Sequence, residues 1–492
     1  MKQSRHHLGV AMALALSLAP LPAANAPAAD GPRRPNILVC LADDWAWPHA
    51  GAYGDKVVRT PQFDRLAREG VLFTHAFCAA PSCSPSRAGL LTGQWPHRLA
   101  EGGNLNGTLP KRFQVYPDLL ETAGYFVGLR GKGWGPGNAK AGGWTRNPAG
   151  PGFASFAAFL KARPKDRPFC FWFGSQDPHR DYEKGSGLRS GLKLEHVVVP
   201  PYLPDTPEVR SDILDYYFEV QRFDADVGEH LKLLQETGES ENTVVVVSGD
   251  NGWPFPHGKT CLYDAGSRQP LAIRWPGRGQ GGRTVDTLVS LTDLAPTFLE
   301  AAGLKPPPEM TGRSLLRLLD GQPLPGPNRV LLERERHAAV RRDDGGHPSG
   351  GLSYPARALR TSEFLFIRNF RPDRWPEGDP ELFMQVGPFG DVDNGPTKAL
   401  ILARRDEPAI APFFRLNFGK RPAEELYDLA KDPHQIRNVA DQPAYGEVRK
   451  KLRAELDAWL KETGDPRLVK DDDRWDRYEY FFPRPPPGLN KK

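Results

Sequence analysis

Three short apolar runs, each followed within a few positions by acidic, amide or imidazole side chains, constrain most strongly what this chain can fold into. The runs cover residues 36–41, 169–173 and 243–247, and aliphatic or aromatic residues dominate them. Runs of this length without polar alternation are typical of strands buried on both faces of a sheet. We therefore expect three such strands, each delivering polar groups at its carboxyl end.

The segments between the runs follow the helical period of apolar residues, most clearly over residues 212–236 and 291–302. Strands that alternate with helices predict the α/β class, with a mainly parallel sheet sandwiched by helices. Ligands of such sheets bind beyond the carboxyl ends of the strands. The polar residues that follow the three runs fall at that edge.

The character of the chain changes after about residue 355. Residues 358–361 and 364–367 predict paired antiparallel strands, residues 424–429 a closing segment, and residues 445–461 a charged amphipathic helix. We expect a smaller C-terminal α+β domain with an antiparallel sheet. The predicted parts are a signal peptide (1–26), a catalytic α/β domain (34–355), the C-terminal domain (356–482) and a Pro-rich tail (483–492).

The first residues have the layout of a secretory signal peptide. Lys2 and Arg5 precede an apolar run over residues 8–21, and residues 24–26 (Ala-Asn-Ala) offer a cleavage site between small residues. The run is too short to cross a bilayer, and no later segment has the ~20 apolar residues that a span requires. These features predict an exported protein, periplasmic or extracellular, without a membrane span. The net charge of +5 gives no argument for a nucleic-acid partner.

Two of the three apolar runs end in pairs of potential metal ligands. Asp43 and Asp44 follow the first run, and Asp250 and Asn251 follow the third. A hard divalent cation prefers oxygen ligands supplied by several segments of the chain. Either pair alone is compatible with a solvated turn, but two pairs at the ends of two apolar strands predict a metal site.

The stretch over residues 83–93 predicts a helix with an anion site at its start. Ser84 is suited to capping the helix and Pro85 to its first position. Cys83 would then lie just before the helix, where free N–H groups and the helix dipole favour an anion. Arg87, one turn later, adds a permanent positive charge. Taken alone, Cys83 is also compatible with an ordinary small buried residue.

The other four cysteines show no metal-binding spacing. Cys40 and Cys170 lie within the apolar runs, where a buried thiol is the ordinary explanation. Cys78 and Cys261 complete the set, and the sequence leaves a disulfide among the four open.

Residues 83–93 read Cys-Ser-Pro-Ser-Arg-Ala-Gly-Leu-Leu-Thr-Gly, which resembles the Cys-x-Pro-Ser-Arg-x-x-x-Leu-Thr-Gly signature of the formylglycine-dependent sulfatases. The resemblance implies an alkaline-phosphatase-like fold. It also implies that a formylglycine-generating maturation enzyme oxidises Cys83 to Cα-formylglycine (3-oxoalanine), whose hydrated aldehyde is the nucleophile. The implied ligands of Ca2+, for which Mg2+ is an alternative, are Asp43, Asp44, Cys83, Asp250 and Asn251.

Three further segments resemble sulfate-binding motifs of the same family. Residues 131–135 (Gly-Lys-Gly-Trp-Gly) resemble its Gly-Lys-Trp-His-x-Gly segment, residues 177–179 its histidine segment, and residues 257–259 its second lysine segment. The resemblance implies that the two lysines bind the sulfate and that the histidine protonates the leaving group. The implied catalytic residues are Cys83, Arg87, Lys132, His179 and Lys259.

One position departs from the family pattern. The family's histidine that hydrogen-bonds the formylglycine hydroxyl falls here on Trp134, and tryptophan cannot accept a proton. We consider His97 and His257 as alternative bases for the release of sulfate, alongside a different arrangement of the site.

The resemblance extends from about residue 35 to residue 466 and points to the heparan N-sulfatase (sulfamidase) subgroup and its bacterial relatives. We expect a hydrolase that removes sulfate from a sulfated carbohydrate. N-sulfoglucosamine is the first candidate substrate, and an O-sulfated sugar of another polysaccharide is the alternative. That subgroup has arginine where Lys259 stands and histidine where Trp134 stands. The candidate sugar-binding residues are Arg180, Arg268, His337 and Trp134.

Two other functions are kept as alternatives. A phosphomonoesterase or phosphonate hydrolase would share the superfamily, but two-metal phosphatases need further His and Asp ligands, and the complete motif at Cys83 favours sulfate. An inactive glycan-binding protein agrees with Trp134, whereas the intact metal ligands argue against it. The sequence leaves the oligomeric state open.

Overall fold

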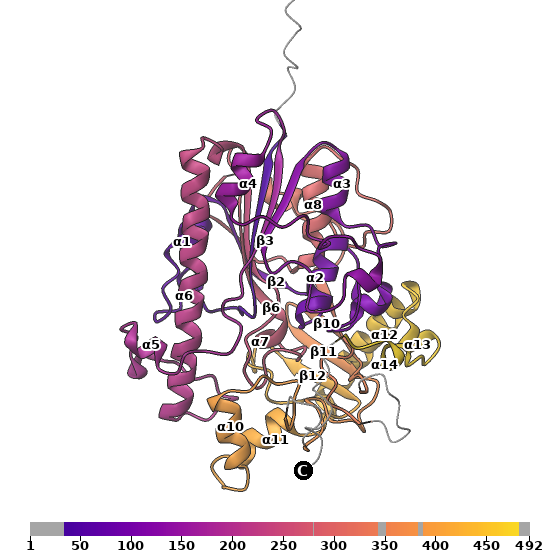
Figure 1. Ribbon diagram of the computed structural model, residues 1–492. Helices are drawn as coiled ribbons and strands as arrows, with labels where there is room; N and C mark the ends of the chain where they lie inside the picture. Colours follow the sequence, from indigo (N-terminus) through magenta and orange to yellow (C-terminus); the bar gives the residue numbers. More distant parts are fainter. Residues whose placement is uncertain (1–33, 279, 343–350, 382–386, 482–492) are drawn as a thin grey trace, which may run out of the picture. The chain divides into compact units, whose positions relative to one another are not determined.

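The computed structural model describes residues 34–278, 280–342, 351–381 and 387–481 (Figure 1). The predicted signal peptide and the Pro-rich tail lie outside the described residues. Within the part of the chain that the structure describes, no helix combines the length and the apolar character that crossing a membrane requires.

Eight strands form a mixed, mainly parallel sheet: β1 (Asn36–Ala42), β2 (Val71–Phe77), β3 (Phe126–Gly131), β4 (Phe169–Gly174), β5 (Thr243–Gly249), β6 (Arg268–Arg274), β7 (Arg283–Val285) and β8 (Val289–Ser290). Their order is β3-β4-β1-β5-β6-β2-β7, and β8 also pairs with β2. Neighbours among β3, β4, β1 and β5 run parallel, whereas β6 is antiparallel to both β5 and β2. The four parallel neighbours therefore end at one edge.

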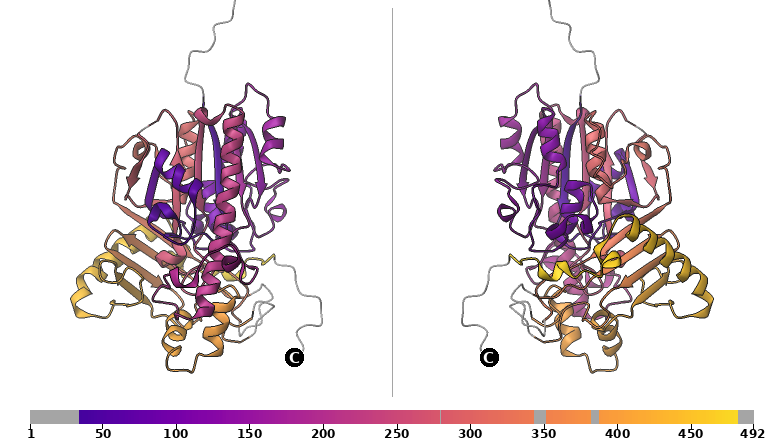
Figure 2. Two further views of the ribbon diagram at one scale, coloured as in Figure 1. Left: turned by 90° about the vertical axis from the view of Figure 1, so that its left-hand side faces the viewer. Right: turned by 90° about the vertical axis from the view of Figure 1, so that its right-hand side faces the viewer.

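Helices cover both faces of this sheet (Figures 1 and 2). One layer holds α1 (Pro61–Glu69), α4 (Phe156–Ala162) and α6 (Pro207–Glu236), and the other holds α2 (Cys83–Thr92), α3 (Tyr116–Thr122) and α8 (Leu294–Ala301). Along β1, Leu38 and Cys40 pack into the first layer, and Ile37 and Val39 into the second. Because successive side chains of a strand point to opposite faces, burial on both sides explains the unbroken apolar run.

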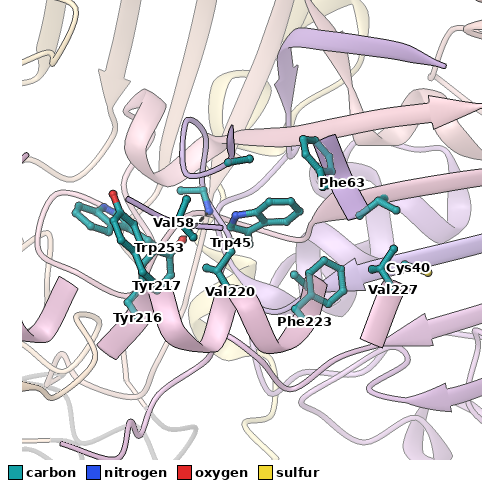
Figure 3. Close-up of a cluster of buried hydrophobic side chains, with 14 of the residues drawn as sticks. Cys40, Trp45, Val58, Phe63, Tyr216, Tyr217, Val220, Phe223, Val227 and Trp253 are labelled. Carbon is teal, nitrogen blue, oxygen red and sulfur yellow. Dashed lines mark hydrogen bonds between the residues drawn. The ribbon is translucent and has the colours of Figure 1, made fainter. Parts of the chain in front are cut away.

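The long helix α6 presents an apolar stripe to the sheet (Figure 3). Val220, Phe223 and Val227 recur at helical spacing and lie on the face turned toward Trp45. The ring centroid of Trp45 lies 5.0 Å from that of Phe63 on α1 and 5.5 Å from that of Phe223, both edge to face. Trp45 follows directly on the acids at the end of β1, so this packing fixes the position of those acids.

The three predicted apolar strands are confirmed as β1, β4 and β5, and the mainly parallel sheet between helices is confirmed with them. The predicted helix over residues 212–236 begins earlier, at Pro207. The Thr206 side chain accepts a hydrogen bond from the Val209 N–H, and proline suits the first helical position.

A second sheet of four antiparallel strands contains β9 (Arg329–Arg334), β10 (Ala356–Thr361), β11 (Phe364–Asn369) and β12 (Glu424–Asp428), in the order β12-β11-β10-β9. The pair predicted over residues 358–361 and 364–367 is confirmed as β10 and β11. The boundary predicted between residues 355 and 356 falls between two paired strands of this sheet. Strand β10 takes one of its two hydrogen-bonded neighbours, β9, from before that point.

The second sheet is buried on both faces. One face packs against α12 (Gly446–Glu462), the helix predicted over residues 445–461, with Leu359 and Phe366 meeting Leu456. The other face packs against the part of the chain that holds the first sheet. There Ala358 lies in one apolar cluster with Phe77 of β2. The shorter helices are α5 (Ser186–Arg189), α7 (Asp264–Ser267), α9 (Leu316–Leu319), α10 (Pro396–Ala403), α11 (Ala411–Phe418), α13 (Pro466–Val469) and α14 (Arg474–Arg477).

Replacing Arg357 of β10 by alanine is expected to lower the free energy of unfolding by about 3–5 kcal/mol, because two buried carboxylates lose a charged partner. Its guanidinium lies 2.7 Å from both Asp465 and Glu335, and none of the three side chains exposes more than 2 %. Urea denaturation followed by circular dichroism measures the loss. Arg453→Ala is the control, because the Arg453 side chain, which pairs with Glu424, is half exposed, and such a pair should contribute less than about 1 kcal/mol. Equal effects of the two substitutions would contradict the prediction.

Candidate active site

Four adjacent parallel strands deliver polar residues to one edge of the first sheet. Gly131 of β3 pairs with Gly174 of β4, and Ala42 of β1 pairs with Gly249 of β5. The residues that follow these strand ends are Lys132, Ser175, Asp43 and Asp250. They therefore emerge side by side, beyond the carboxyl ends of the strands.

The backbone of Lys132 is fixed by a close approach between β3 and β4. A Cβ atom on Gly174 would lie 1.8 Å from the Lys132 carbonyl oxygen, so only glycine fits there. The same carbonyl accepts hydrogen bonds from Nη1 of Arg87 at 2.7 Å and from Nε1 of Trp172 at 3.0 Å. These contacts hold the start of the Lys132 side chain at the strand edge.

Helix α2 begins at Cys83, and Ser82 is its N-cap. The predictions that Ser84 caps this helix and that Cys83 precedes it are therefore wrong. The Ser84 hydroxyl donates instead to the Pro136 carbonyl, while Ser82 has the extended backbone of a cap. Residue 83 lies in the first turn, where backbone N–H groups have no partner within the helix.

Cys83 is buried against the acids at the end of β1. Its side chain is 2 % exposed, and Sγ lies 3.4 Å from Oδ1 of Asp43 and 4.0 Å from Oδ1 of Asp44. Burial, and then the charge of Asp43, raise the pKa of the thiol well above its usual value. As a thiol this residue stays protonated, and a protonated thiol is a weak nucleophile.

Each acid at the end of β1 faces a lysine from another segment. Nζ of Lys132 lies 2.5 Å from Oδ2 of Asp43, and Nζ of Lys259 lies 2.8 Å from Oδ2 of Asp44. Burial alone would raise the pKa of Asp43, but Lys132, His179 and Arg87 outweigh it and hold that pKa below its usual value. Asp44 has a left-handed backbone with φ of 71°, which aspartate tolerates better than most residues.

Arg87 and Asp250 form a buried ion pair behind residue 83. Nε of Arg87 lies 2.7 Å from Oδ2 of Asp250, and Oδ1 of Asp250 accepts the N–H of Asp44 at 3.0 Å. Nη2 of Arg87 has no hydrogen-bond partner among the described residues and lies 3.9 Å from Oδ1 of Asp43. A buried N–H group without an acceptor, next to residue 83, is suited to an oxygen of a bound anion.

The oxygen atoms of this cluster fit a hard divalent cation. Nδ2 of Asn251 donates to Oδ1 of Asp44 at 2.7 Å, while Oδ1 of Asn251 is buried without a hydrogen-bond donor in the described chain. The ligand atoms of Asp43, Asp44 and Cys83 lie within 4.8 Å of one another. A buried acceptor without a donor, beside several carboxylates, is what a cation would satisfy.

His179 lies where the cluster meets solvent. Its Nδ1 is 2.5 Å from the Arg180 carbonyl oxygen, to which the ring donates, and its Nε2 is 3.8 Å from Oδ2 of Asp44. The side chain is 35 % exposed, whereas Asp44 is fully buried. The hydrogen bond at Nδ1 fixes the orientation of the ring and leaves Nε2 directed toward a molecule bound at the cluster.

Asp393 belongs to this cluster and was not predicted from the sequence. Its Oδ2 lies 3.1 Å from Nζ of Lys259, and one ligand atom each of Asp44, His179 and Asp393 lie within 4.8 Å of one another. Asp393 follows no apolar strand and comes 134 residues after Lys259. A pair of carboxylates, Asp391 and Asp393, in the short stretch over residues 391–394 is the only sequence signal, and acids in loops are common.

The candidate sugar-binding residues are placed differently from one another. Nδ1 of His337 lies 2.7 Å from the Ser82 hydroxyl, next to residue 83. Arg180 is buried and forms two hydrogen bonds to Asp212, at 2.7 and 2.9 Å. Arg268 lies over the Trp47 ring and 3.3 Å from Asp264, in contacts outside the cluster. The structure thus brings His337 to the site, whereas Arg180 and Arg268 pair with other side chains of the protein.

Trp134 and the alternative bases are all buried. Trp134 is 4 % exposed and its backbone N–H donates to Asn147. Nδ1 of His97 lies 2.7 Å from Glu333, and the His257 ring stacks on Tyr263 at 4.2 Å. In the described part of the chain, neither histidine is hydrogen-bonded or ion-paired to the residues around Cys83, so the structure does not bring them to the nucleophile position.

The mainly parallel sheet between helices, with polar residues gathered beyond its strand ends, is an alkaline-phosphatase-like fold. The family model described as Sulfatase matches residues 35–304. The chain belongs to the sulfatase family and is a sulfatase.

Individual relatives cover most of the chain. It is 30 % identical to N-sulphoglucosamine sulphohydrolase of Homo sapiens, over 89 % of this chain and 92 % of that protein. It is 27 % identical to an ulvan-active sulfatase of Formosa agariphila, over 88 % of this chain and 76 % of that protein. The solved structure of BT4656 with its substrate D-glucosamine-2-N,6-O-disulfate matches with a TM-score of 0.61 and 20 % identity, over 89 % of this chain and 100 % of that chain.

Proposed function

We propose that this sulfatase removes the N-linked sulfate from N-sulfoglucosamine units of a sulfated carbohydrate. In the proposal, residue 83 acts as Cα-formylglycine, and Ca2+ is held by Asp43, Asp44, Asp250 and Asn251, with Mg2+ as the alternative ion. The chain would be exported, and a formylglycine-generating enzyme of the host would mature Cys83. The 30 % identity to the human N-sulphoglucosamine sulphohydrolase over 89 % of this chain supports the choice of substrate.

One observation carries the proposal of sulfate chemistry. Three cations, Arg87, Lys132 and Lys259, converge on the two acids beside residue 83 from three separate segments. Fixed positive groups of this kind neutralise charge that grows on the oxygens of a transferring sulfate. Nη2 of Arg87, which lacks a partner in the described chain, adds a donor ready for one of those oxygens.

In the proposed reaction, separate residues bind the sulfate and protonate the leaving atom. Lys132 and Lys259 bind and orient the sulfate oxygens, and Nη2 of Arg87 donates to one of the same oxygens. His179, when both ring nitrogens are protonated, gives the proton on Nε2 to the leaving atom, and the hydrogen bond from Nδ1 to the Arg180 carbonyl orients the ring for this transfer. When present, formylglycine supplies a geminal diol whose second hydroxyl gives the sulfate a route of departure, and the cation supplies charge neutralisation.

The test of substrate is sulfate release by enzyme purified from its native host. N-sulfoglucosamine and glucosamine 6-sulfate are offered side by side, and released sulfate is measured by ion chromatography. Release from the first sugar only supports the proposal. Release from the second only would keep the sulfatase and overturn the N-sulfate assignment.

Removal of divalent cations is expected to abolish sulfate release and to lower the melting temperature. A cation that binds only the folded state stabilises it by about 2.7 kcal/mol at one hundred times its Kd, and that contribution disappears with the ion. Dialysis against a chelator, followed by Ca2+ or Mg2+ in separate samples, measures both effects. Full activity after exhaustive chelation would contradict the metal assignment.

An O-sulfated polysaccharide is the second candidate substrate. The 27 % identity to an ulvan-active sulfatase over 88 % of this chain favours it. Ulvan, added to the side-by-side assay as a third substrate, decides between the two.

A further inference from the structure

Asp393 adds a negative charge to a site built for an anion. Its carboxylate lies 3.1 Å from Nζ of Lys259, which already pairs with Asp44 at 2.8 Å. Unlike Asp44, which is fully buried, Asp393 keeps 24 % of its side chain exposed. A carboxylate in this position repels sulfate, so binding of the sulfate group does not explain it.

The segment that carries Asp393 is anchored on its N-terminal side. Asp391 accepts hydrogen bonds from Arg334 and Arg341 and, at 2.9 Å, from the N–H of Ala338. All of these groups are buried, so the chain is fixed two residues before Asp393.

The segment is anchored on its C-terminal side as well. Asp212 accepts hydrogen bonds from both the N–H and the hydroxyl of Thr397, at 3.1 and 2.7 Å, while Arg180 holds Asp212 from the other side. Nζ of Lys398 donates to the Val392 carbonyl oxygen at 2.7 Å. The carboxylate of Asp393 is thus held in place by the protein before any substrate arrives.

Asp393 lies on the side of the site where the leaving atom must be. One ligand atom each of Asp393, His179 and Asp44 lie within 4.8 Å of one another. If His179 protonates the leaving atom, a carboxylate this close to it faces the same atom. The leaving atom is a nitrogen in an N-linked sulfate and an oxygen in an O-linked sulfate, and the two differ in charge. The nitrogen is basic and becomes positive before its bond to sulfur breaks. An ester oxygen does not carry that charge.

We propose that Asp393 is a specificity-determining residue that stabilises the positive charge on a leaving nitrogen and so favours N-linked over O-linked sulfate. This inference rests on the proposed function. In the step, nitrogen takes the proton from Nε2 of His179. The attacking hydroxyl of residue 83 gives its proton to the neighbouring Asp43 carboxylate, and its oxygen forms a bond to sulfur. The nitrogen–sulfur bond breaks with its electron pair staying on nitrogen. The free amine then takes a proton from solvent and leaves as an ammonium group.

The test is Asp393→Asn, which keeps the shape of the side chain and removes its charge. The expected result is a fall in kcat on N-sulfoglucosamine of about 10- to 100-fold, the effect of losing one hydrogen bond to a charged group. The inhibition constant of inorganic sulfate should stay the same or decrease, because a negative charge next to the anion has gone. The ratio of kcat/KM for N-sulfoglucosamine over glucosamine 6-sulfate should fall. Asp393→Glu, which keeps the charge, should preserve more of that ratio.

The matched control is Asn394→Ala in the same segment, whose side-chain oxygen accepts only from Lys398 among the hydrogen bonds of the described chain. It should keep both kcat and sulfate inhibition. If Asp393→Asn weakens inhibition by sulfate and lowers kcat/KM by the same factor for both substrates, Asp393 only positions Lys259. That result would overturn the inference. If the wild-type enzyme releases no N-linked sulfate, the proposed function fails first and the inference falls with it. The wild-type assay therefore separates the two failures.

Discussion

Replacing Cys83 by alanine is expected to lower kcat for sulfate release by at least about 10⁴-fold, because the group proposed to attack sulfur is lost. Cys83 lies in the first turn of α2, 3.4 Å from Asp43, with Arg87 and both lysines around it. The substitution removes the nucleophile but leaves those charges in place. Inorganic sulfate should therefore still bind to the variant, which calorimetry measures alongside the loss of turnover.

The control for this substitution is Cys78→Ala. Cys78 is also a fully buried free thiol, and its Sγ contacts the Gly266 carbonyl at 3.9 Å. That variant should lose some stability but retain turnover. Mass spectrometry of the peptide containing Cys83 from the native host completes the test. An aldehyde in place of the thiol agrees with the proposal, and an intact thiol in fully active enzyme would contradict it.

Replacing Asp250 by asparagine is expected to lower kcat/KM on the order of 10³-fold, because a charge at the reacting centre is lost. One oxygen of Asp250 accepts the Asp44 N–H and the other accepts Nε of Arg87. Asparagine has only one oxygen, so its amide N–H group must face one of these two donors. Breaking a buried ion pair in this way should also cost about 3 kcal/mol of stability.

Asp264→Asn separates the loss of stability from the loss of function. Asp264 pairs with Arg360 at 2.9 Å and is also buried, but it lies outside the cluster around residue 83. Both variants should melt at lower temperature than the wild type. Only Asp250→Asn should lose the rise in melting temperature on adding Ca2+, together with activity. An Asp250→Asn variant with normal turnover and a normal response to Ca2+ would contradict the assignment.

The central strands of the first sheet could be predicted from the sequence because a strand buried on both faces is an unbroken apolar run. The runs that become β1, β4 and β5 are of this kind. Once parallel strands are accepted, register brings their ends together without further information. For that reason Asp43 and Asp250, which are 207 positions apart, could be placed at one edge from the sequence alone.

Other features depend on contacts that no local pattern encodes. Ser84 is a good capping residue, but its hydroxyl donates to the Pro136 carbonyl, and Ser82 occupies the N-cap position of α2 instead. Strand β9 belongs to the second sheet because it pairs with β10. The sequence of β9 itself does not reveal this pairing. Asp393 reaches Lys259 only through anchors at Asp391 and Thr397 that come from distant segments.

The position of β9 makes the two sheets a single cooperative unit. The N–H of Glu333 donates to the Ala79 carbonyl oxygen at 2.8 Å, and the Glu333 carboxylate accepts from the N–H of His97 at 2.7 Å. These bonds join the second sheet to the chain on both sides of α2. Melting of either sheet therefore removes support from the other. In a fragment that ended before β10, β9 would lose the strand with which it pairs. The segments at Ala79 and His97, which flank α2, would then lose their support from Glu333.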